Sequence, residues 1–365
     1  MAGIYVHIPF CKSRCIYCDF YSQTSLALRQ RYVDAVCREA NMRSSYIKER
    51  VRTIYIGGGT PSQLEPRQLV QIFQVLGSAE EVTIEVNPDD VTPSFAGALS
   101  ELPVNRVSMG AQTFSEERLR FLRRRHSAAQ VTQAVRLLRE VGIENISVDL
   151  MYGFPNETMD EWVRDIDAVL TLDVEHVSAY SLQYEEGTSL FRMLENGDVS
   201  KVDEELERQM YFTLKDRLKS AGYEHYEISN FARPGYRSRH NSSYWRQVPY
   251  LGLGAAAHSF DGRSRQWNVA DVRQYIEGIE QGKPMAEQEL LTPDNQYNEI
   301  VMTALRTCEG IDVSKFSEGY RNYCLAQAQT FINNGLLVKD GTCIRLSREG
   351  LFVSDMIMTA LMHVE

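Results

Sequence analysis

Six short runs rich in β-branched and other apolar residues recur along the first half of the chain, and longer segments with helical periodicity lie between them. A strand followed by a helix, repeated about six times, builds a parallel sheet through right-handed crossovers. Closure of such a sheet gives a (β/α) barrel, complete or partial, with a doubly wound sheet as the alternative. We therefore expect an α/β fold whose core is a partial (β/α) barrel of the TIM type.

The remaining chain changes character after about residue 235. Residues 234–268 are rich in Gly, Arg, aromatic residues and His, and beyond residue 290 helical segments flank a short β pair at 336–347. The expected domains are a barrel core over 1–233, a linking region over 234–289 and a small C-terminal α+β domain of winged-helix type over 290–365. The expected strands are 4–8, 53–56, 82–86, 106–110, 145–150 and 176–183, and the expected helices are 27–48, 65–76, 115–140, 158–171 and 202–221.

Charge and cysteine content narrow the classes of function. The net charge of -10 argues against a surface built to bind nucleic acid. No run approaches the ~20 apolar residues of a membrane span, and the N-terminus lacks the pattern of a signal peptide. Seven cysteines suit a reduced, cytoplasmic setting with a metal or redox motif better than a disulfide framework.

Three of those cysteines, Cys11, Cys15 and Cys18, follow the first expected strand with the spacing C-x3-C-x2-C. Thiolates at this spacing can hold a zinc ion or an iron–sulfur cluster, and three unrelated buried cysteines are the bland alternative. A structural zinc needs a fourth ligand, for which His7 and Asp19 are the local candidates, although neither completes a usual zinc pattern. A cluster with three protein ligands would leave one iron open to a small molecule.

Other unusual loops also follow expected strands. The stretch "GGGTP" (57–61) has three glycines, which permit close approach of the backbone to a ligand or a tight turn into a helix. Glu85 ends an apolar strand, where a carboxylate is costly unless it is paired. Because the carboxyl ends of barrel strands share one mouth, we expect these loops and the cysteines to converge there.

"YVHIPFC-x3-C-x2-C", together with "GGGTP" and "VSMGAQTF", resembles the radical S-adenosylmethionine (SAM) superfamily. In that superfamily three cysteines hold a [4Fe–4S] cluster, and SAM chelates the open iron through its amino and carboxylate groups. The resemblance also turns the charged run 118–126, otherwise a solvated helix face, into part of a site. The SAM contacts that it implies are Tyr5, Tyr17, Gly58, Gly59, Thr60, Glu85, Gln112, Arg124 and Asp149.

Within that superfamily the whole chain resembles the oxygen-independent coproporphyrinogen III oxidase-like family. The oxidases of this family, which decarboxylate two propionates, typically carry a longer N-terminal segment and a further cysteine two residues beyond the triplet, where this chain has Phe20. The heme chaperones of the HemW type carry H-N-x-x-Y-W, which stands here at 240–245. The resemblance therefore favours the heme chaperones.

In the heme chaperones this motif implies a heme ligand. His240 would offer an imidazole nitrogen to the heme iron, and Tyr244 and Trp245 would supply flat surface for the porphyrin. His258 is a second candidate ligand, with a structural role as its alternative. The function that we predict is binding of a [4Fe–4S] cluster, SAM and heme, with delivery of heme to respiratory hemoproteins.

The rival functions are the oxidase itself and a non-catalytic iron–sulfur scaffold. The sequence leaves open whether SAM is cleaved. A homodimer is compatible with the resemblance. So is a peripheral contact with a membrane, although no basic amphipathic helix argues for one.

Overall fold

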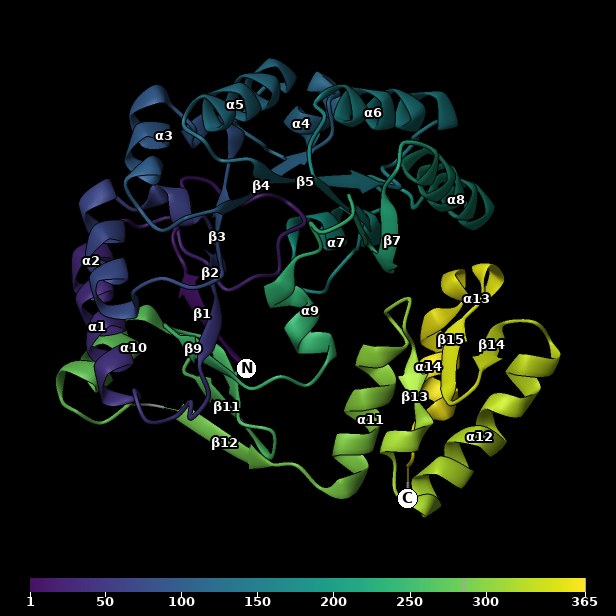
Figure 1. The fold of residues 1–365 in the computed structure, drawn as a ribbon. Helices are drawn as coiled ribbons and strands as arrows, with labels where there is room; N and C mark the ends of the chain where they lie inside the picture. Colours follow the sequence, from purple (N-terminus) through teal and green to yellow (C-terminus); the bar gives the residue numbers. More distant parts are fainter. Residues whose placement is uncertain (285, 365) are drawn as a thin grey trace.

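The computed structural model describes residues 1–284 and 286–364, and its largest feature is a curved twelve-stranded sheet (Figure 1). Six strands at its centre follow one another in sequence order, and each is parallel to the next. These strands are β1 (Ala2–Ile8), β2 (Val51–Gly58), β3 (Glu81–Val86), β4 (Arg106–Gln112), β5 (Asn145–Tyr152) and β6 (His176–Ser181). All six strands predicted from the sequence are confirmed.

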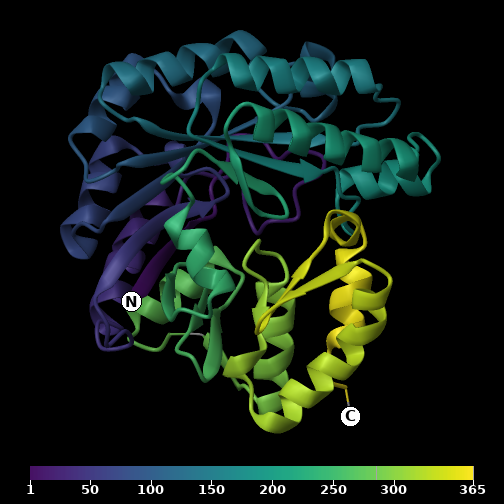
Figure 2. The same cartoon turned by 45° about the vertical axis from the view of Figure 1, so that its right-hand side comes forward.

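Helices cover the outer face of this sheet, and the inner face curves around a central space that receives α9 (Arg239–Trp245) (Figures 1 and 2). Sequential strand order with the connecting helices on one face confirms the partial barrel over the doubly wound sheet. The outer helices are α1 (Arg29–Met42), α2 (Pro66–Leu76), α3 (Pro93–Ser100), α4 (Glu116–Phe121), α5 (Ala128–Glu140), α6 (Met159–Thr171) and α8 (Glu204–Ser220).

The single helix predicted over 115–140 is wrong, because the chain breaks between α4 and α5. Ser127 starts α5 with a capping box: its hydroxyl accepts from the backbone N–H of Gln130, and the Gln130 side chain accepts from the Ser127 N–H. Arg123, just before this cap, adopts a positive φ of 57°. The break directs the basic residues of 122–127 toward the barrel instead of along a solvated helix.

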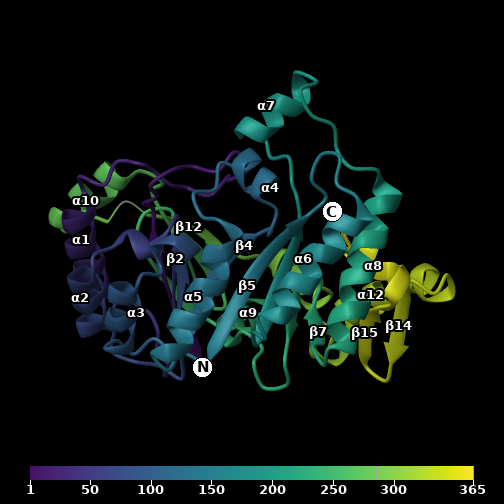
Figure 3. The same ribbon diagram turned by 90° about the horizontal axis from the view of Figure 1, so that it is seen from above.

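One short helix lies at the end of the barrel where the parallel strands finish. α7 (Ser189–Glu195) stands above that end in Figure 3. Its Leu190 donates a backbone hydrogen bond to Ile16 of the cysteine loop and packs in the same small apolar cluster. This contact supports the loop from outside the sheet.

The region predicted as a linker adds strands to the same sheet. β9 (Tyr250–Leu253) runs parallel to β1, and β10 (His258–Phe260), β11 (Ser264–Asn268) and β12 (Ala286–Leu290) continue the sheet in antiparallel fashion. α10 (Val272–Glu280) packs against α1. At the other edge β8 (Asn230–Ala232) and β7 (Glu224–Glu227) follow β6. The domain boundaries given above stay predictions.

The C-terminal segment forms the expected small α+β unit around its own apolar cluster. Its strands pair in the order β13-β15-β14, all antiparallel, and the predicted β pair is confirmed. Across residues 1–284 and 286–364, no helix has the length and apolar content needed to cross a membrane. The unit consists of α11 (Pro293–Ala304), β13 (Ile311–Asp312), α12 (Glu318–Asn333), β14 (Leu337–Asp340), β15 (Cys343–Leu346), α13 (Arg348–Phe352) and α14 (Ser354–Leu361).

A buried carboxylate fastens the added strands to the barrel. Glu39 of α1 is fully buried and forms an ion pair with Arg43 at 3.0 Å. It also accepts hydrogen bonds from the Gly254 N–H at 2.9 Å, the Asn268 amide at 2.9 Å and the Tyr275 hydroxyl at 2.6 Å. Without this carboxylate the buried N–H of Gly254 and hydroxyl of Tyr275 would lose their acceptor, so its contribution is far above that of a surface charge.

We expect Glu39→Ala to lower the free energy of unfolding by about 3–5 kcal/mol, because it removes a fully buried acceptor of an ion pair and leaves the buried donors of Gly254 and Tyr275 without a partner. The matched control is Glu280→Ala, which removes an exposed ion pair with Arg31 at 2.8 Å and should cost about 0–1 kcal/mol. Denaturant titration of both variants measures the difference. Equal losses would contradict the role assigned to Glu39.

Candidate functional site

A cavity of about 500 Å³ opens where β1 to β6 end and reaches down into the barrel. We call its open end the mouth. The three cysteines of the triplet line it, together with nearly all the SAM contacts implied by resemblance. The predicted residues in its wall are Cys11, Cys15, Cys18, Tyr17, Gly58, Gly59, Thr60, Glu85, Gln112, Arg124 and Asp149.

Tyr5 is the predicted SAM contact that does not line the cavity. Its hydroxyl is 3.0 Å from Nδ1 of His7, and its ring centroid lies 6.2 Å from that of Tyr55. Nε2 of His7 is in turn 2.9 Å from the carbonyl oxygen of Tyr21. Both nitrogens of His7 are therefore occupied, and His7 offers no ligand to a zinc ion in this structure.

The glycines at the end of β2 occupy positions where a side chain would not fit. A Cβ on Gly58, which has a φ of 112°, would lie 2.6 Å from the His7 ring, and a Cβ on Gly59 would lie 3.0 Å from two backbone oxygens. The Gly59 N–H donates to the carbonyl of Ile8 at 2.8 Å, which joins this loop to the end of β1. The loop thus brings bare backbone to the cavity.

The cysteines are free thiols at the rim of this cavity. Burial raises the pKa of Cys11 and of Cys18, so both thiols are neutral until a metal centre binds. Within the described ranges 1–284 and 286–364, no three His, Cys, Asp or Glu side chains are grouped as a site for one metal ion.

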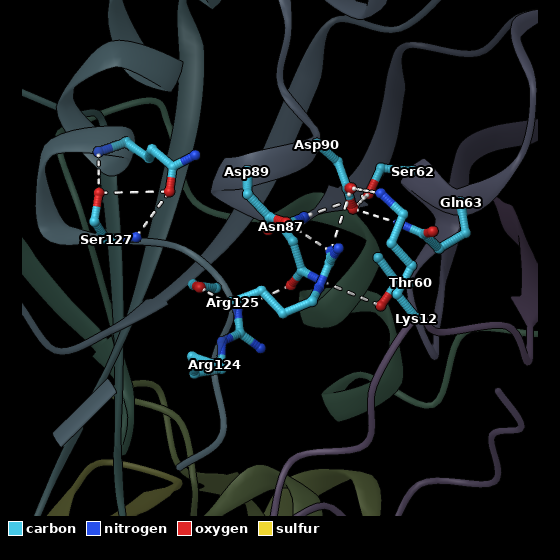
Figure 4. A network of polar contacts seen from close by, with 12 residues as sticks. Lys12, Thr60, Ser62, Gln63, Asn87, Asp89, Asp90, Arg124, Arg125 and Ser127 are labelled. Atoms are coloured by element: carbon cyan, nitrogen blue, oxygen red, sulfur yellow. Dashed lines mark hydrogen bonds and ion pairs between the residues drawn. The ribbon is translucent and has the colours of Figure 1, made fainter. Parts of the chain in front are cut away.

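The loops at the mouth are joined by the carboxylate of Asp90 (Figure 4). Asp90 accepts from Ser62 at 2.8 Å and Gln63 at 2.5 Å, and it pairs with Lys12 at 3.1 Å and Arg125 at 3.3 Å. These partners come from the loops after β1, β2 and β4, and Asp90 itself follows β3. We call this set the Asp90 network.

Arg124 places a cation beside the cysteines. Its guanidinium donates to the side-chain oxygen of Asn87 at 2.8 Å (Figure 4) and to the carbonyl of Gly110. Its Nη1 lies 3.6 Å from Sγ of Cys15. Asn87 was not predicted as a site residue, although it directly follows β3 and lies two positions beyond Glu85. Arg124 can therefore receive a carboxylate close to the triplet.

Two carboxyl groups face the same cavity. Glu85 accepts from the Tyr55 hydroxyl at 2.7 Å and from the Gly58 N–H at 3.0 Å, and Ser108 lies 3.5 Å from Asp149. Burial raises the pKa of Glu85 to about 7 and that of Asp149 to about 6. A cationic ligand would favour their ionised forms. The two carboxyls can bind a cation, and Arg124 can bind an anion. This combination matches the ammonium and carboxylate groups at the amino-acid end of SAM.

Gln112 has an unusual backbone. It adopts a φ of 68° where β4 bulges against β5. Left-handed conformations of residues other than Gly cost free energy, and they cluster at binding sites. The bulge keeps Gln112 in the cavity wall at the end of its strand.

The H-N-x-x-Y-W motif forms α9 on the inner face of the sheet, in contact with β1 and β2. Glu81 accepts from the backbone N–H groups of Arg239 at 2.9 Å and His240 at 2.8 Å. His240 is 1% exposed, with Nδ1 2.8 Å from the Thr53 hydroxyl and Nε2 2.8 Å from the Tyr244 hydroxyl. Burial lowers the pKa of His240 to about 3, so the ring is neutral and neither nitrogen is free.

The other candidate heme residues, Tyr244, Trp245 and His258, contact different neighbours. Tyr244 contacts His240 edge-on at 5.0 Å, and Trp245 lies 6.0 Å from Tyr226. Asn241, which the prediction gave no role, lines the cavity and brings the motif to the same site as the cysteines. His258 is exposed on β10, stacks on Trp267 at 5.9 Å and lies outside the cavity wall.

Comparison with known proteins gives matches over nearly the whole chain. Residues 5–169 match the radical SAM superfamily, and residues 291–353 match the HemN C-terminal domain. The heme chaperone HemW of Bacillus subtilis is 36% identical over 331 residues, covering 88% of this chain and 87% of its own. A Bos taurus protein called radical S-adenosyl methionine domain-containing protein 1, mitochondrial, is 31% identical over 400 residues, covering 99% of this chain and 87% of its own.

Among solved structures, coproporphyrinogen III oxidase (HemN) from Escherichia coli superposes with a TM-score of 0.85. The match covers 99% of this chain and 89% of that protein at 22% identity. At this identity the likeness is one of fold, and it confirms the architecture predicted from the sequence.

The raised pKa of Glu85 has a measurable consequence for stability. A carboxyl that titrates near 7 when folded and near 4.5 when unfolded holds its proton longer in the folded state, so stability falls as pH rises through this window. We expect Glu85→Gln to gain stability relative to the unchanged protein between pH 4.5 and pH 8, by about 3 kcal/mol. Urea unfolding of the ligand-free protein at both pH values tests this, and a pH-independent difference would contradict it.

Proposed function

Because the chain belongs to the HemW family of heme chaperones within the radical SAM superfamily, we propose that it binds a [4Fe–4S] cluster, SAM and heme and delivers heme to respiratory hemoproteins. The observation that carries this proposal is the convergence, in one cavity, of three free thiols, a glycine loop, two carboxyls and a guanidinium. We further propose a cytoplasmic location. A homodimer and a peripheral contact with a membrane are both compatible with this proposal.

Different residues at the mouth would bind the cluster and the two charged groups of SAM. Cys11, Cys15 and Cys18 ligate the cluster as thiolates, so loading releases protons and becomes easier as pH rises. Glu85 offers a carboxylate to the ammonium group of SAM, and Arg124 offers its guanidinium to the SAM carboxylate. When bound and reduced, the cluster supplies one electron for cleavage of SAM. The walls of the cavity orient the ligand and exclude water.

Heme is the cargo, and His240 is its proposed iron ligand. In this structure Nε2 of His240 is hydrogen-bonded to the Tyr244 hydroxyl and Nδ1 to the Thr53 hydroxyl. Ligation through Nε2 therefore requires Tyr244 to move away. His240 is neutral, which is the form of imidazole that binds iron.

The oxidase is the rival function. The fold likeness to HemN does not decide it, because the same fold can carry different activities. Phe20 stands where the oxidases typically have a further cysteine, and its ring is 64% exposed in the wall of the mouth. Formation of protoporphyrinogen from coproporphyrinogen III by the reduced, reconstituted protein with SAM would favour the oxidase.

We expect Cys15→Ser to lose most of the brown absorbance of the reconstituted protein, because one of three ligands to the cluster is removed. Cys308→Ser, at an exposed cysteine outside the cavity wall, is the matched control and should keep it. Iron and sulfide analysis after anaerobic reconstitution measures both. Full iron and sulfide content in Cys15→Ser would defeat the cluster assignment.

We expect His240→Ala to weaken hemin binding, and Tyr244→Phe to strengthen it about fivefold. The second variant keeps the ring and removes the hydroxyl that Nε2 must release, a hydrogen bond whose net worth is about 1 kcal/mol. Hemin titrations followed by absorbance give both affinities. Equal affinity and identical spectra for His240→Ala and the unchanged protein would exclude His240 as the ligand.

A further inference from the structure

The interior of the barrel holds a buried guanidinium without a partner. Arg106, at the start of β4, is 1% exposed. Its Nε and Nη1 have no hydrogen-bond partner within residues 1–284 and 286–364, and it joins none of the ion pairs formed there. Buried charges in proteins are normally paired, so this arginine requires an explanation.

Arg106 belongs to a row of buried polar side chains that lack hydrogen-bond partners in the described part of the chain. In the sheet it lies between Thr83 on β3 and Asn145 on β5. The hydroxyl of Thr83 and the side-chain oxygen of Asn145 are also buried without a hydrogen-bond partner in the described part of the chain. We call this row the floor. Three adjacent strands thus present unsatisfied polar atoms at one level of the barrel.

The floor communicates with the cavity already described. Inward positions alternate along a strand, so Arg106, Ser108 and Gly110 lie on the same side of β4. Arg106 and Ser108 line the cavity, as Gln112 does at the mouth. A ligand group that enters at the mouth and passes Ser108 therefore reaches the guanidinium.

The acidic residues around Arg106 are engaged elsewhere. Glu81 accepts from two backbone N–H groups of α9, and Glu85 accepts from Tyr55 and Gly58. Asp149 is paired with Ser108 across the sheet. None of these carboxyls forms an ion pair with Arg106 in the described ranges, although its charge lowers the pKa of Glu85 and of Asp149 against the effect of burial.

The two histidines near Arg106 do not neutralise it either. His176 has Nδ1 2.7 Å from the Ser147 hydroxyl and Nε2 2.7 Å from the Tyr226 hydroxyl, and His240 is held in the same manner. Burial and the charge of Arg106 both lower the pKa of each ring, so both are neutral. The floor therefore carries one positive charge that no contact compensates.

We propose that Arg106 binds a carboxylate group of a ligand at the floor of the barrel, a subsite separate from the SAM contacts at the mouth. A guanidinium fork matches a carboxylate in shape and charge, and the Thr83 hydroxyl adds a donor beside it. A group with a single negative charge suits the site, because Glu85 and Asp149 already share the cavity.

Two ligands of the proposed function carry carboxylates: SAM, through its amino-acid end, and heme, through its propionate arms. Arg124, which lies beside Cys15 at the mouth, is already the proposed partner of the SAM carboxylate. The propionate arms of the porphyrin have no such partner, so we assign Arg106 to a propionate. This choice of ligand rests on the proposed function, whereas the carboxylate subsite does not.

The test compares hemin with hemin dimethyl ester, in which both propionates are blocked, and includes SAM as a third probe. We expect the unchanged, reconstituted protein to bind hemin about tenfold more tightly than the ester, as a charge-assisted contact implies. Arg106→Gln should lose this preference and keep its affinity for SAM. Arg136→Gln, which removes an exposed charge on α5, is the control and should keep the preference.

The outcomes separate the two proposals. If Arg106→Gln weakens SAM tenfold and leaves the hemin preference intact, the subsite stands and its ligand is SAM. If Arg106→Gln binds all three probes as the unchanged protein does, the subsite is overturned. If the unchanged protein binds neither porphyrin, heme transport fails and the SAM titration alone decides the subsite. Should Arg106→Gln not fold, Arg106→Lys, which keeps the charge and loses the fork, should lose most of the preference instead.

Discussion

The carboxylate of Asp90 holds together loops that follow four consecutive strands, and the geometry of the mouth depends on it. Loops that leave a sheet have no ladder of hydrogen bonds to fix them. Here Lys12 of the cysteine loop, Ser62 after the glycines and Arg125 beside Arg124 all reach the same side chain. Because that carboxylate is nearly buried, these contacts are weakly screened by solvent. The triplet, the glycine loop and the arginine are thereby placed before any cofactor binds.

Beneath the mouth, the barrel departs from the usual packing of its class. Barrel interiors of the TIM type are filled by layers of branched apolar side chains. Here the inward positions carry Tyr55, Glu85, Arg106 and Asp149, and they leave a cavity. The polar lining costs stability. Burial raises the pKa of Glu85 and of Asp149 toward neutral pH, and it leaves the Arg106 guanidinium without a hydrogen-bond partner in the described part of the chain. Features that reduce stability in this way persist where a ligand supplies the missing partners.

Much of this was predictable from local pattern, and the rest depended on tertiary contacts. Strand periodicity predicted β1 to β6, and the spacing of the cysteines predicted a metal site. The helix break before α5 was also readable, since Ser127 and Gln130 form a capping box in the sequence. In contrast, the contact between His240 and Thr53 joins residues 187 positions apart. Arg106 resembled an ordinary polar strand end, and only the fold shows it enclosed and unpaired.

The heme motif and the cofactor cavity share a wall, which gives the two sites a physical connection. The His240 ring stacks on Tyr55 at 5.2 Å, and the Tyr55 hydroxyl donates to Glu85 at 2.7 Å. Asn241, one residue further along α9, lines the cavity itself. A rearrangement within α9 that turns Tyr244 away from His240 would also disturb the stacking of His240 on Tyr55, and through Tyr55 the carboxylate proposed to hold SAM. Coupling between binding sites requires such a shared element with two arrangements, and α9 is the element that this fold offers.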